Sequence, residues 1–472
     1  MSWISRREFL HKSAAAVCCT FLFDNCGKAE SAPNIIFFLT DDQRWDTLGC
    51  MGNSTIQTPN LDRLARHGTL FKNHFITYAY CAPSRATFLT GRYYDHHQIA
   101  RKREWPPGVF EQTYPVLLRQ AGYYTGFIGK WHMGEVRDEA FDYCWGFAGQ
   151  ARYYNMIAGK TEHLTTTIGG KAIDFIKQAP QNQPFCLSVS FKAPHVDGND
   201  PRQFLYDPAY ESLYRDVTIA APESAAPEHF QGLPDFIKNS EARKRWELRF
   251  SSPQKFQESV KGYYRLITGV DTVIGEILAT LREKRIQQQT VVIFSGDNGF
   301  FLGEHGLAGK WLMYEESIRT PLIIMDPRAP GRSRGNIRDE MVLNIDLAPT
   351  VLALAGVQPP AVMQGRSLLP LVSGQMRNDW REAWFYQHYA YGGNPPENDS
   401  VYIPSSEGVR LAKWKYIRYI DQQPNYEQLF DLEKDPHEMI NLAYDQRYEK
   451  IKDALREKWR ELKLTVAHSE KL

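Results

Sequence analysis

The chain has 472 residues, enough for one large domain with an appendage or for two to three domains of ordinary size. Hydrophobic residues make up 43% and charged residues 24%, which is close to the globular average and excludes a disordered, collagen-like or coiled-coil chain. The 56 Lys and Arg residues balance 55 Asp and Glu residues, so no overall field would hold nucleic acid or an anionic membrane. Any bound anion must be held in a local pocket.

The first 31 residues have the pattern of an export signal. Paired arginines at positions 6 and 7 precede an apolar stretch over residues 14–23, which is too short to span a bilayer. The pattern resembles the twin-arginine signal and predicts cleavage after Ser31, so that the mature protein works in the periplasm or outside the cell. An amphipathic first helix and a lipid anchor on Cys26 are the alternatives. No later run is long enough for a transmembrane segment.

Beyond Pro33 short apolar runs alternate with helical periodicity, which is typical of an α/β domain. The expected strands cover residues 35–40, 125–128, 185–191, 290–294 and 321–325. Helices are expected over residues 58–68 and 113–121, where a threonine and a proline open each segment, and over 260–281, where apolar residues recur every three or four positions. Residues 197–253 are rich in Pro, Asp and Glu with weak periodicity, which predicts an irregular insertion.

The pattern of apolar and aromatic residues changes after Gly374. Aromatic residues cluster or alternate over residues 384–389, 408–411 and 414–420, another strand-like run covers 427–431, and a charged helix starts near 448. Short strands followed by a terminal helix predict a smaller α+β domain. The expected division is therefore a signal over residues 1–31, a large α/β domain over 32–375 and a C-terminal domain over 376–472.

Unusual polar residues directly follow four of the expected strands. They are Asp41 and Asp42, Lys130 and His132, His195, and Asp297 and Asn298. If these strands are parallel neighbours, their carboxyl ends share one edge of the sheet and the polar groups converge on one crevice. Carboxylate and amide oxygens suit Ca²⁺ or Mg²⁺ rather than zinc, and several carboxylates at one edge repel each other without a cation. For either acidic pair alone, a helix cap or an Asx turn is the alternative.

The segment from Cys81 to Gly91 supplies a candidate anion site. Ser84 is expected to cap a helix whose first turn holds Arg85, and the amino terminus of a helix favours anions. Cys81 is either a thiolate nucleophile or a buried structural cysteine, and composition does not choose between the two.

Five separated motifs resemble those of the formylglycine-dependent type I sulfatases and occur in that family's order. They are Cys81-Ala82-Pro83-Ser84-Arg85 with Leu89-Thr90-Gly91, the run from Gly122 to His132, Ala193-Pro194-His195, Ser295-Gly296-Asp297-Asn298-Gly299, and Gly309-Lys310. The resemblance covers residues 34 to about 370. It implies an alkaline-phosphatase-like α/β fold, in which helices flank a large, mixed, mostly parallel sheet and a smaller C-terminal domain carries an antiparallel sheet. The spacing around residues 303–306 resembles the iduronate-sulfatase and N-acetylglucosamine-6-sulfatase branch.

The resemblance also implies a role for each site residue. A maturation enzyme would oxidise Cys81 to formylglycine, whose hydrate attacks sulfur with one hydroxyl while a cation, Ca²⁺ or Mg²⁺, polarises it. The implied metal ligands are Asp41, Asp42, residue 81, Asp297 and Asn298. Arg85, Lys130 and Lys310 would hold the charge of the sulfate. His195, with Lys310, would protonate the leaving alcohol, and His132 would take a proton from the second hydroxyl.

The pocket that would hold the rest of the substrate has weaker candidates. They are His305, His97 and His388, for each of which a packing or loop role is the alternative. The function expected from the resemblance is exported hydrolysis of sulfate esters on a polysaccharide or a glycosaminoglycan-type glycan. The rivals are a phosphodiester or phosphonate monoester hydrolase of the same superfamily and an unmodified, non-catalytic glycan-binding protein.

Overall fold

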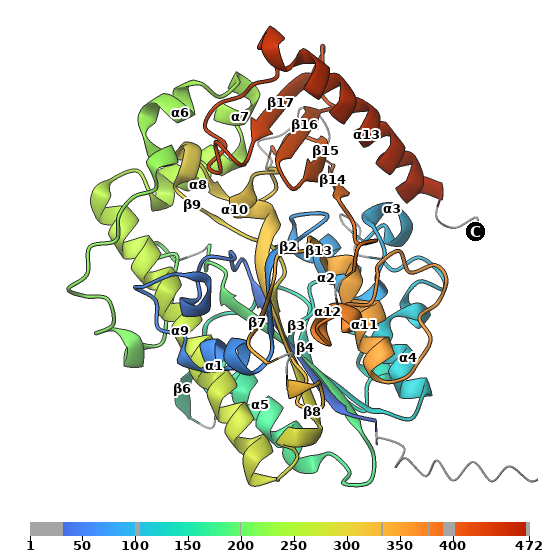
Figure 1. Ribbon diagram of the computed structural model, residues 1–472. Coiled ribbons are helices and arrows are strands. Elements are labelled where there is room, and N and C mark those ends of the chain that lie inside the picture. Colours follow the sequence, from blue (N-terminus) through green and yellow to red (C-terminus); the bar gives the residue numbers. More distant parts are fainter. Residues whose placement is uncertain are drawn as a thin grey trace, which may run out of the picture. The chain divides into compact units, whose positions relative to one another are not determined.

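The fold is seen in a computed structural model (Figure 1). It describes residues 32–99, 104–157, 159–198, 200–331, 334–375, 377–389 and 402–468. The predicted export signal lies outside the described residues. None of the described helices is both long and apolar enough to cross a lipid bilayer.

A mixed sheet of nine strands runs through the larger part of the described chain. Its order is β12-β2-β11-β8-β1-β7-β3-β4, with β13 beside β2. The strands are β1 (Asn34–Asp41), β2 (Thr69–Phe75), β3 (Tyr124–Lys130), β4 (Tyr143–Phe147), β7 (Phe185–Pro194), β8 (Thr290–Gly296), β11 (Arg319–Met325), β12 (Asn336–Arg338) and β13 (Val342–Leu343). All five expected strands are present. The neighbours β8, β1, β7, β3 and β4 are parallel, whereas β11 runs antiparallel to both β8 and β2.

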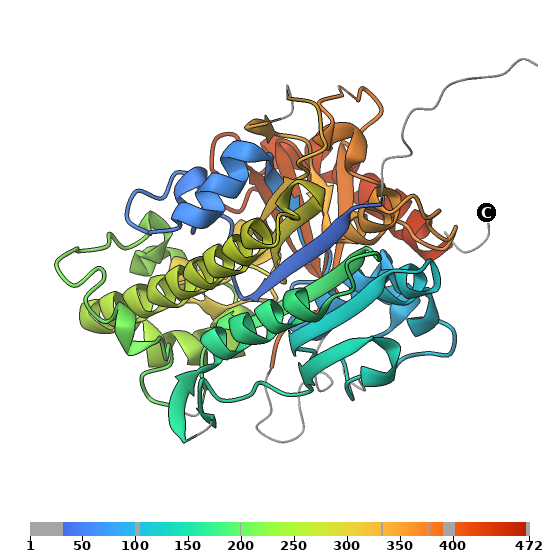
Figure 2. The same ribbon diagram turned by 90° about the horizontal axis from the view of Figure 1, so that it is seen from below.

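Helices cover both faces of this sheet, as Figures 1 and 2 show. The side chains of β1 alternate between the two apolar layers, with Ile36 and Phe38 on one side and Ile35 and Phe37 on the other. The first layer holds α1 (Pro59–His67), α5 (Leu164–Gln178) and α9 (Pro253–Glu283). The second holds α2 (Cys81–Thr90), α4 (Tyr114–Gln120), α11 (Leu347–Leu354) and α12 (Leu369–Val372). Because β1 is buried on both faces, only its ends are open to polar chemistry.

The helices differ from the sequence-based expectation in two places. α9 begins at Pro253 rather than at residue 260, because the Ser252 hydroxyl caps it by accepting from the Lys255 amide at 3.2 Å and proline suits the first helical position. The expectation of an irregular insertion over residues 197–253 is wrong in part, since it contains the nine-residue α8 (Glu241–Arg249) and the shorter α6 (Pro227–Gln231) and α7 (Asp235–Lys238). α8 buries only Ala242 and Arg249, so it lacks the apolar periodicity that reveals a helix.

The C-terminal part carries an antiparallel sheet in the order β14-β15-β16-β17. Its strands are β14 (Ala383–His388), β15 (Ser406–Leu411), β16 (Trp414–Tyr419) and β17 (Tyr426–Asp431), and α13 (Glu449–His468) packs on it. Trp384 and Val409 of this sheet share one apolar cluster with Met313, and the Tyr386 hydroxyl donates to the Trp311 carbonyl. The predicted boundary near residue 375 precedes β14, and both sides of it belong to one compact unit, Pro33–Leu472.

Strands β3 and β7 approach each other closely at Gly129, the residue before Lys130 at the end of β3. Its φ is +102°, and a Cβ there would lie 2.0 Å from the Ser190 carbonyl oxygen of β7. Gly122 has a similar φ of +90° but no atom within 4 Å of the added Cβ. We expect Gly129→Ala to lower the free energy of unfolding by roughly 2–5 kcal/mol, against about 1–2 kcal/mol for Gly122→Ala, where only backbone strain is added. Denaturant unfolding measures both, and equal losses would contradict the close approach.

Candidate active site

The carboxyl ends of four adjacent strands bring the predicted polar residues together. In register, Leu39 of β1 lies beside Ser190 of β7 and Ser295 of β8, so these strands end at one edge. Asp41 ends β1 and Lys130 ends β3, while His195 follows β7 and Asp297 follows β8. The side chains of all four are at least largely buried. The chain therefore gathers acids and bases at an edge of the sheet where the flanking apolar layers end.

Four potential metal ligands form the centre of this edge. Asp41, Asp42, Cys81 and Asp297 each offer a ligand atom, and these atoms all lie within 4.8 Å of one another. Asn298 joins them, because its Nδ2 donates to Asp42 Oδ1 at 2.7 Å. The Asn298 Oδ1 is buried and has no hydrogen-bond partner among the described residues. Buried polar atoms normally have a hydrogen-bond partner. The unpartnered Asn298 oxygen beside three carboxylates is therefore a fifth potential metal ligand.

The electrostatics of this cluster favour a bound cation. Burial and the charge of Asp41 raise the pKa of Asp297 to about 7. Burial also acts to raise the pKa of Asp41, but Lys130, His195, Arg85 and Lys310 outweigh it and hold that pKa well below its usual range. Hard carboxylate and amide oxygens are the donors that Ca²⁺ and Mg²⁺ prefer. The residues present therefore fit a hard divalent cation.

Cys81 is the first residue of α2, and its thiol points into the cluster, with Sγ 3.3 Å from Asp41 Oδ1. The expectation that Ser84 caps the helix is wrong, because its amide already donates to the Tyr80 carbonyl within the helix at 3.0 Å. The helix starts earlier than expected because Pro83 is tolerated in a first turn, where amides lack helical acceptors. The Ser84 hydroxyl instead donates to the Asp297 carbonyl at 2.5 Å, which ties α2 to the end of β8.

Three buried cations surround the carboxylates. Lys310 Nζ lies 2.8 Å from Cys81 Sγ and donates to Asp42. Lys130 donates to Asp41, and Arg85 donates from Nε to Asp297 Oδ2 at 2.9 Å. Each cation thus pairs most closely with a different carboxylate, and Arg85 and Lys310 also lie within 4 Å of Asp41. Although burial acts to lower the pKa of Lys310, Asp42 and its neighbours raise it above its usual range, so the ammonium is charged at neutral pH.

Two histidines border the cluster, and the structure fixes the tautomer of one of them. His195 Nδ1 lies 2.7 Å from the Val196 carbonyl oxygen, which can only accept, so Nδ1 carries a proton. Nε2 is then directed toward the carboxylates, 3.7 Å from Asp42 Oδ2. Burial lowers the pKa of His195 to about 3, which leaves the free imidazole neutral. His132 lines the same hollow with a left-handed φ of +59°.

A hollow of about 970 Å³ opens above this cluster. It is lined by Cys81, His132, His195 and Lys310 together with His388, whose ring lies 5.1 Å from that of Tyr78. The other two substrate-pocket candidates are not among its lining residues. His97 bonds the Thr87 hydroxyl at 3.0 Å inside the fold, and the ring of His305 packs 4.7 Å from Tyr314.

Several residues of this site escaped the sequence analysis. Gln150 accepts from Lys130 at 2.7 Å, and Ser190 accepts from Arg85. Ser190 had a signal, because Ser188, Ser190 and Lys192 place a polar residue at every second position of a strand that is otherwise apolar. Gln150 had none, since it lies in a segment without periodicity or motif.

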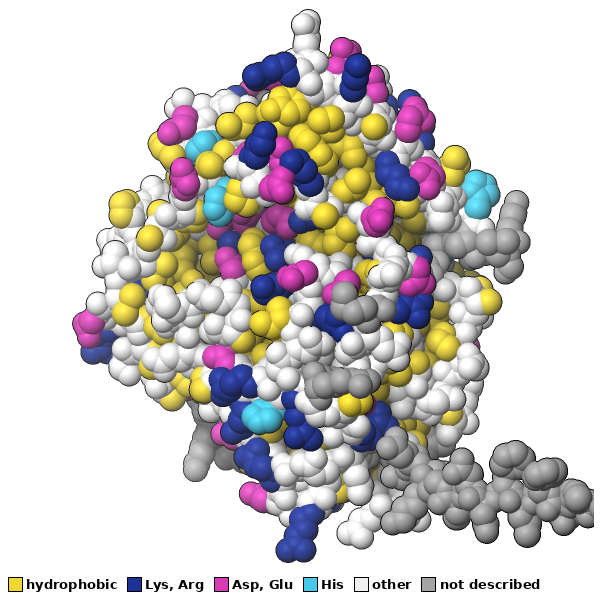
Figure 3. Space-filling model, in the orientation of Figure 1, with side chains coloured by type: hydrophobic (Ala, Val, Ile, Leu, Met, Phe, Trp, Pro, Cys, Tyr) yellow, Lys and Arg dark blue, Asp and Glu magenta, His cyan; other side chains and the backbone are white. Residues whose placement is uncertain are grey.

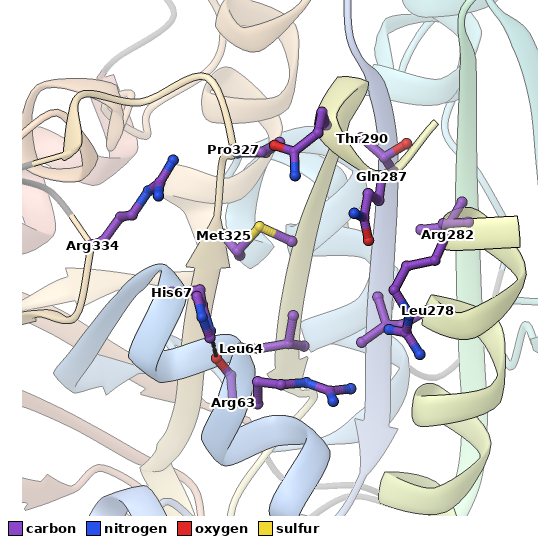
Figure 4. A pocket seen from close by; sticks show the side chains of 12 residues that line it. Arg63, Leu64, His67, Leu278, Arg282, Gln287, Thr290, Met325, Pro327 and Arg334 are labelled. Carbon is purple, nitrogen blue, oxygen red and sulfur yellow. Dashed lines mark hydrogen bonds between the residues drawn. The ribbon is translucent and has the colours of Figure 1, made fainter. Parts of the chain in front are cut away.

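A second hollow, of about 470 Å³, lies at the opposite end of the central strands, where β8 begins and β11 ends (Figure 4). Thr290, the first residue of β8, and Met325, the last residue of the antiparallel β11, line it together with Arg63, His67 and Arg282. On the molecular face that Figure 3 shows, basic side chains gather in the lower half. None of the predicted site residues lines this hollow, so the chemistry lies at the other edge.

Comparison with known proteins decides between the classes of enzyme that this geometry allows. The family model described as sulfatase matches residues 33–357, and one described as N-sulphoglucosamine sulphohydrolase, C-terminal, matches residues 303–465. The chain belongs to the sulfatase family. A sulfatase of this family is a sulfuric ester hydrolase, and membership implies a formylglycine and a divalent cation.

Individual relatives place this sulfatase in the carbohydrate branch. It is 30% identical to the N-acetylglucosamine-6-O-sulfatase of Bacteroides thetaiotaomicron, over 89% of this chain and 84% of the relative. A solved structure in complex with its substrate D-glucosamine-2-N,6-O-disulfate is 29% identical, with a TM-score of 0.80 over 93% of this chain and all of the other. The phosphonate monoester hydrolase of Agrobacterium radiobacter has a TM-score of 0.72 over 92% of this chain and 96% of its own, but only 21% identity, which shows a common fold alone.

Removal of divalent metal should destabilise this sulfatase, because the folded state loses the binding free energy of the metal, and only Arg85, Lys130 and Lys310 then offset the buried carboxylates. Metal at about 100 times its Kd should add roughly 2.7 kcal/mol to the free energy of unfolding. Asp297→Asn should make stability insensitive to a chelator. Asp200 is a partly exposed acid that lines the same hollow, and the control Asp200→Asn should leave the chelator effect intact. Thermal melts with and without chelator measure this, and a wild-type melt that ignores the chelator would exclude a metal site.

Proposed function

We propose that this sulfatase hydrolyses a sulfate ester of a sulfated saccharide, using a formylglycine made from Cys81 and a divalent cation, Ca²⁺ or Mg²⁺. The observation that carries the proposal is the position of Cys81. It begins α2, its Sγ lies 3.3 Å from Asp41 and 2.8 Å from Lys310, and it lines the hollow in which a substrate would lie. The helix amino terminus adds a favourable field for a sulfate group at this point.

The formylglycine and the cation would supply the reactive chemistry. Hydrated formylglycine would supply a hydroxyl nucleophile whose sulfate ester can be released by reforming the aldehyde. The cation would act as a Lewis acid, and Asp41, Asp42, Asp297 and Asn298 would hold it. The protein's own residues then have to place the sulfate, hold its charge and supply a proton. Their arrangement supports each of these tasks.

Arg85, Lys130 and Lys310 are the residues we assign to the sulfate charge. All three are buried, and their positions are fixed by carboxylates of the cluster. A fixed positive charge in a site that excludes water stabilises developing negative charge without reorganisation. Gln150 and Ser190 accept further hydrogen bonds from Lys130 and Arg85, which helps to hold these two cations in the site.

His195, with Lys310, is assigned to protonating the leaving alcohol. Its Nε2 faces the cluster because Nδ1–H is held by the Val196 carbonyl. A sulfate ester adds negative charge next to the imidazole, which favours its charged form, and Lys310 is already protonated. His132 lines the same hollow as residue 81 and is assigned to accepting a proton when sulfate is released.

The substrate we propose is a sulfated hexosamine of a glycosaminoglycan-type glycan. Support comes from the N-acetylglucosamine-6-O-sulfatase relative and from the neighbour with glucosamine-2-N,6-O-disulfate as its substrate. A hollow of about 970 Å³ is large enough for one or two sugar rings. Tyr78, Tyr389 and His388 give one of its walls an aromatic surface of the kind that packs on sugar rings.

We also propose that the protein is exported before it acts. The support is the paired arginines, the short apolar stretch and the small residues near Ser31. Polymeric sulfated glycans are too large to enter a cell unaided, so a periplasmic or secreted enzyme fits such a substrate.

Cys81→Ala should abolish hydrolysis of N-acetylglucosamine-6-O-sulfate while leaving the melting temperature within a few degrees of the wild type, because only the nucleophile is removed. Mass spectrometry of the wild-type peptide that contains residue 81 should show formylglycine. An unmodified thiol in active protein from the native host would contradict the mechanism. Faster turnover of a phosphodiester or phosphonate monoester than of any sulfated saccharide would favour the rival activity instead.

His195→Ala should slow hydrolysis of a sugar sulfate about 10²–10⁴-fold, because an unactivated alkoxide needs a proton to leave. With 4-nitrophenyl sulfate, whose leaving group needs no proton, the loss should be about tenfold or less. Steady-state kinetics on both substrates measure the difference. Equal losses on the two substrates would show that His195 positions the ester rather than protonating the alcohol.

A further inference from the structure

Arg249, the last residue of α8, is a buried cation without a counter-charge in the wall of the active-site hollow. Its side chain is only 3% exposed, yet it lines the same hollow as Cys81 and Lys310. Its Nε donates to Gln203 Oε1 at 3.0 Å, and its buried Nη1 has no hydrogen-bond partner among the described residues. No salt bridge to an acid is found for it in the described part of the chain. A buried guanidinium with an unmet donor is costly unless a ligand completes it.

The other arginines that line this hollow are either paired with an acid or, like Arg152, exposed to solvent. Arg245, one turn earlier on α8, pairs with Glu241 at 2.7 Å, and Arg202 pairs with Asp200 at 2.8 Å. In the catalytic cluster, Arg85 is likewise matched by Asp297. Burial and the charge of Arg245 lower the pKa of Arg249 to about 9, so it still carries its charge at neutral pH. Asp42 and Glu241 act on this charge only from beyond ion-pair distance, so Arg249 presents to the hollow a positive charge that no acid among the described residues contacts.

The orientation of Arg249 is fixed. Gln203 Nε2 donates to the Asp200 carbonyl at 2.8 Å, which turns Gln203 Oε1 toward Arg249 and leaves it as an acceptor for Nε. The Ser259 hydroxyl donates to the Arg249 carbonyl at 2.9 Å and fixes the backbone at the end of α8. The guanidinium also lies over the ring of Phe300, 5.9 Å from its centroid. A charge held this firmly is suited to selecting a ligand of one geometry.

We propose that Arg249 binds a second anionic group of the saccharide, a sulfate or a carboxylate other than the ester that is hydrolysed. This inference rests on the proposed function and adds a specificity residue to it. The cations around residue 81 are already engaged with Asp297, Asp41 and Asp42, whereas Arg249 has donors to spare. A guanidinium binds two oxygens of one oxyanion through parallel N–H groups, a geometry that a neutral hydroxyl does not match. The preferred substrate would then carry at least two negative groups.

Kinetics with three substrates test the proposal. They are N-acetylglucosamine-6-O-sulfate, glucosamine-2-N,6-O-disulfate, and a disaccharide in which the first sugar is linked to a uronic acid. For each enzyme, kcat/KM for the second and for the third substrate is divided by kcat/KM for the first. At least one of these two ratios should be about 10–100-fold lower in Arg249→Gln than in the wild type. A loss of preference for the disulfate identifies a second sulfate, and one for the uronate disaccharide identifies a carboxylate. Unchanged ratios for both would overturn the proposal.

Two further variants separate recognition from structure. Arg249→Lys, which keeps the charge but not the fork, should restore part of the preference. Arg202→Gln, the matched control with a paired arginine in the same wall, should leave the ratios as in the wild type. Because a buried unmatched charge does not stabilise a fold, Arg249→Gln should melt at or above the wild-type temperature. A marked fall in its melting temperature together with unchanged ratios would show that Arg249 is structural.

A binding measurement independent of turnover distinguishes failure of this inference from failure of the proposed function. Crystals of Cys81→Ala soaked in selenate should show an anomalous peak within hydrogen-bond distance of the Arg249 guanidinium, and the peak should vanish in Cys81→Ala with Arg249→Gln. Absence of that peak excludes a sulfate at Arg249, and together with an unchanged ratio for the uronate disaccharide it overturns the role of Arg249. If the wild type hydrolyses no sulfated saccharide while the peak is present, the proposed substrate class fails and the anion site at Arg249 stands.

Discussion

The arrangement of the active site depends on one constraint, the mutual repulsion of the buried carboxylates. Asp41, Asp42 and Asp297 come from two adjacent strand ends and are forced together by the parallel register of β1 and β8. Left alone, such a group would lose its charge or push the strands apart. Arg85, Lys130 and Lys310 each pair most closely with a different carboxylate, and the amide oxygen Asn298 Oδ1 has no partner among the described residues and can accept a cation. The rest of the fold serves to hold these opposing charges in place.

The strands were predictable because their signal is local. A run of apolar residues that is buried on both faces, bounded by turn residues, indicates a parallel strand wherever it occurs, as in β1 and β8. The polar residues at the strand ends stood out for the same reason, since Asp41 and Asp297 come directly after the apolar runs of β1 and β8. One rule about parallel strands then placed residues about 250 positions apart side by side.

What could not be predicted depends on contacts that the sequence does not display. α8 buries only Ala242 and Arg249, so it carries no apolar stripe. Ser84 looked like a cap because a serine often is one, yet α2 already starts at Cys81. His97 and His305 sit in suggestive motifs, but their side chains are used for packing and internal hydrogen bonds rather than for lining the hollow. Arg249 gave no signal at all, since only the tertiary structure shows that it lacks a partner.

The apolar cluster that joins the C-terminal sheet to Met313 has a consequence for how this protein can change over time. Lys310 sits three residues before Met313, and the Trp311 carbonyl between them is anchored by Tyr386 of β14. The last hundred or so residues are therefore part of the scaffold that positions Lys310, the lysine we propose to be catalytic. Exchanging that tail between relatives, whether by recombination or by engineering, would alter reactivity and sugar preference at once, so the two halves of such a gene are expected to have been inherited together.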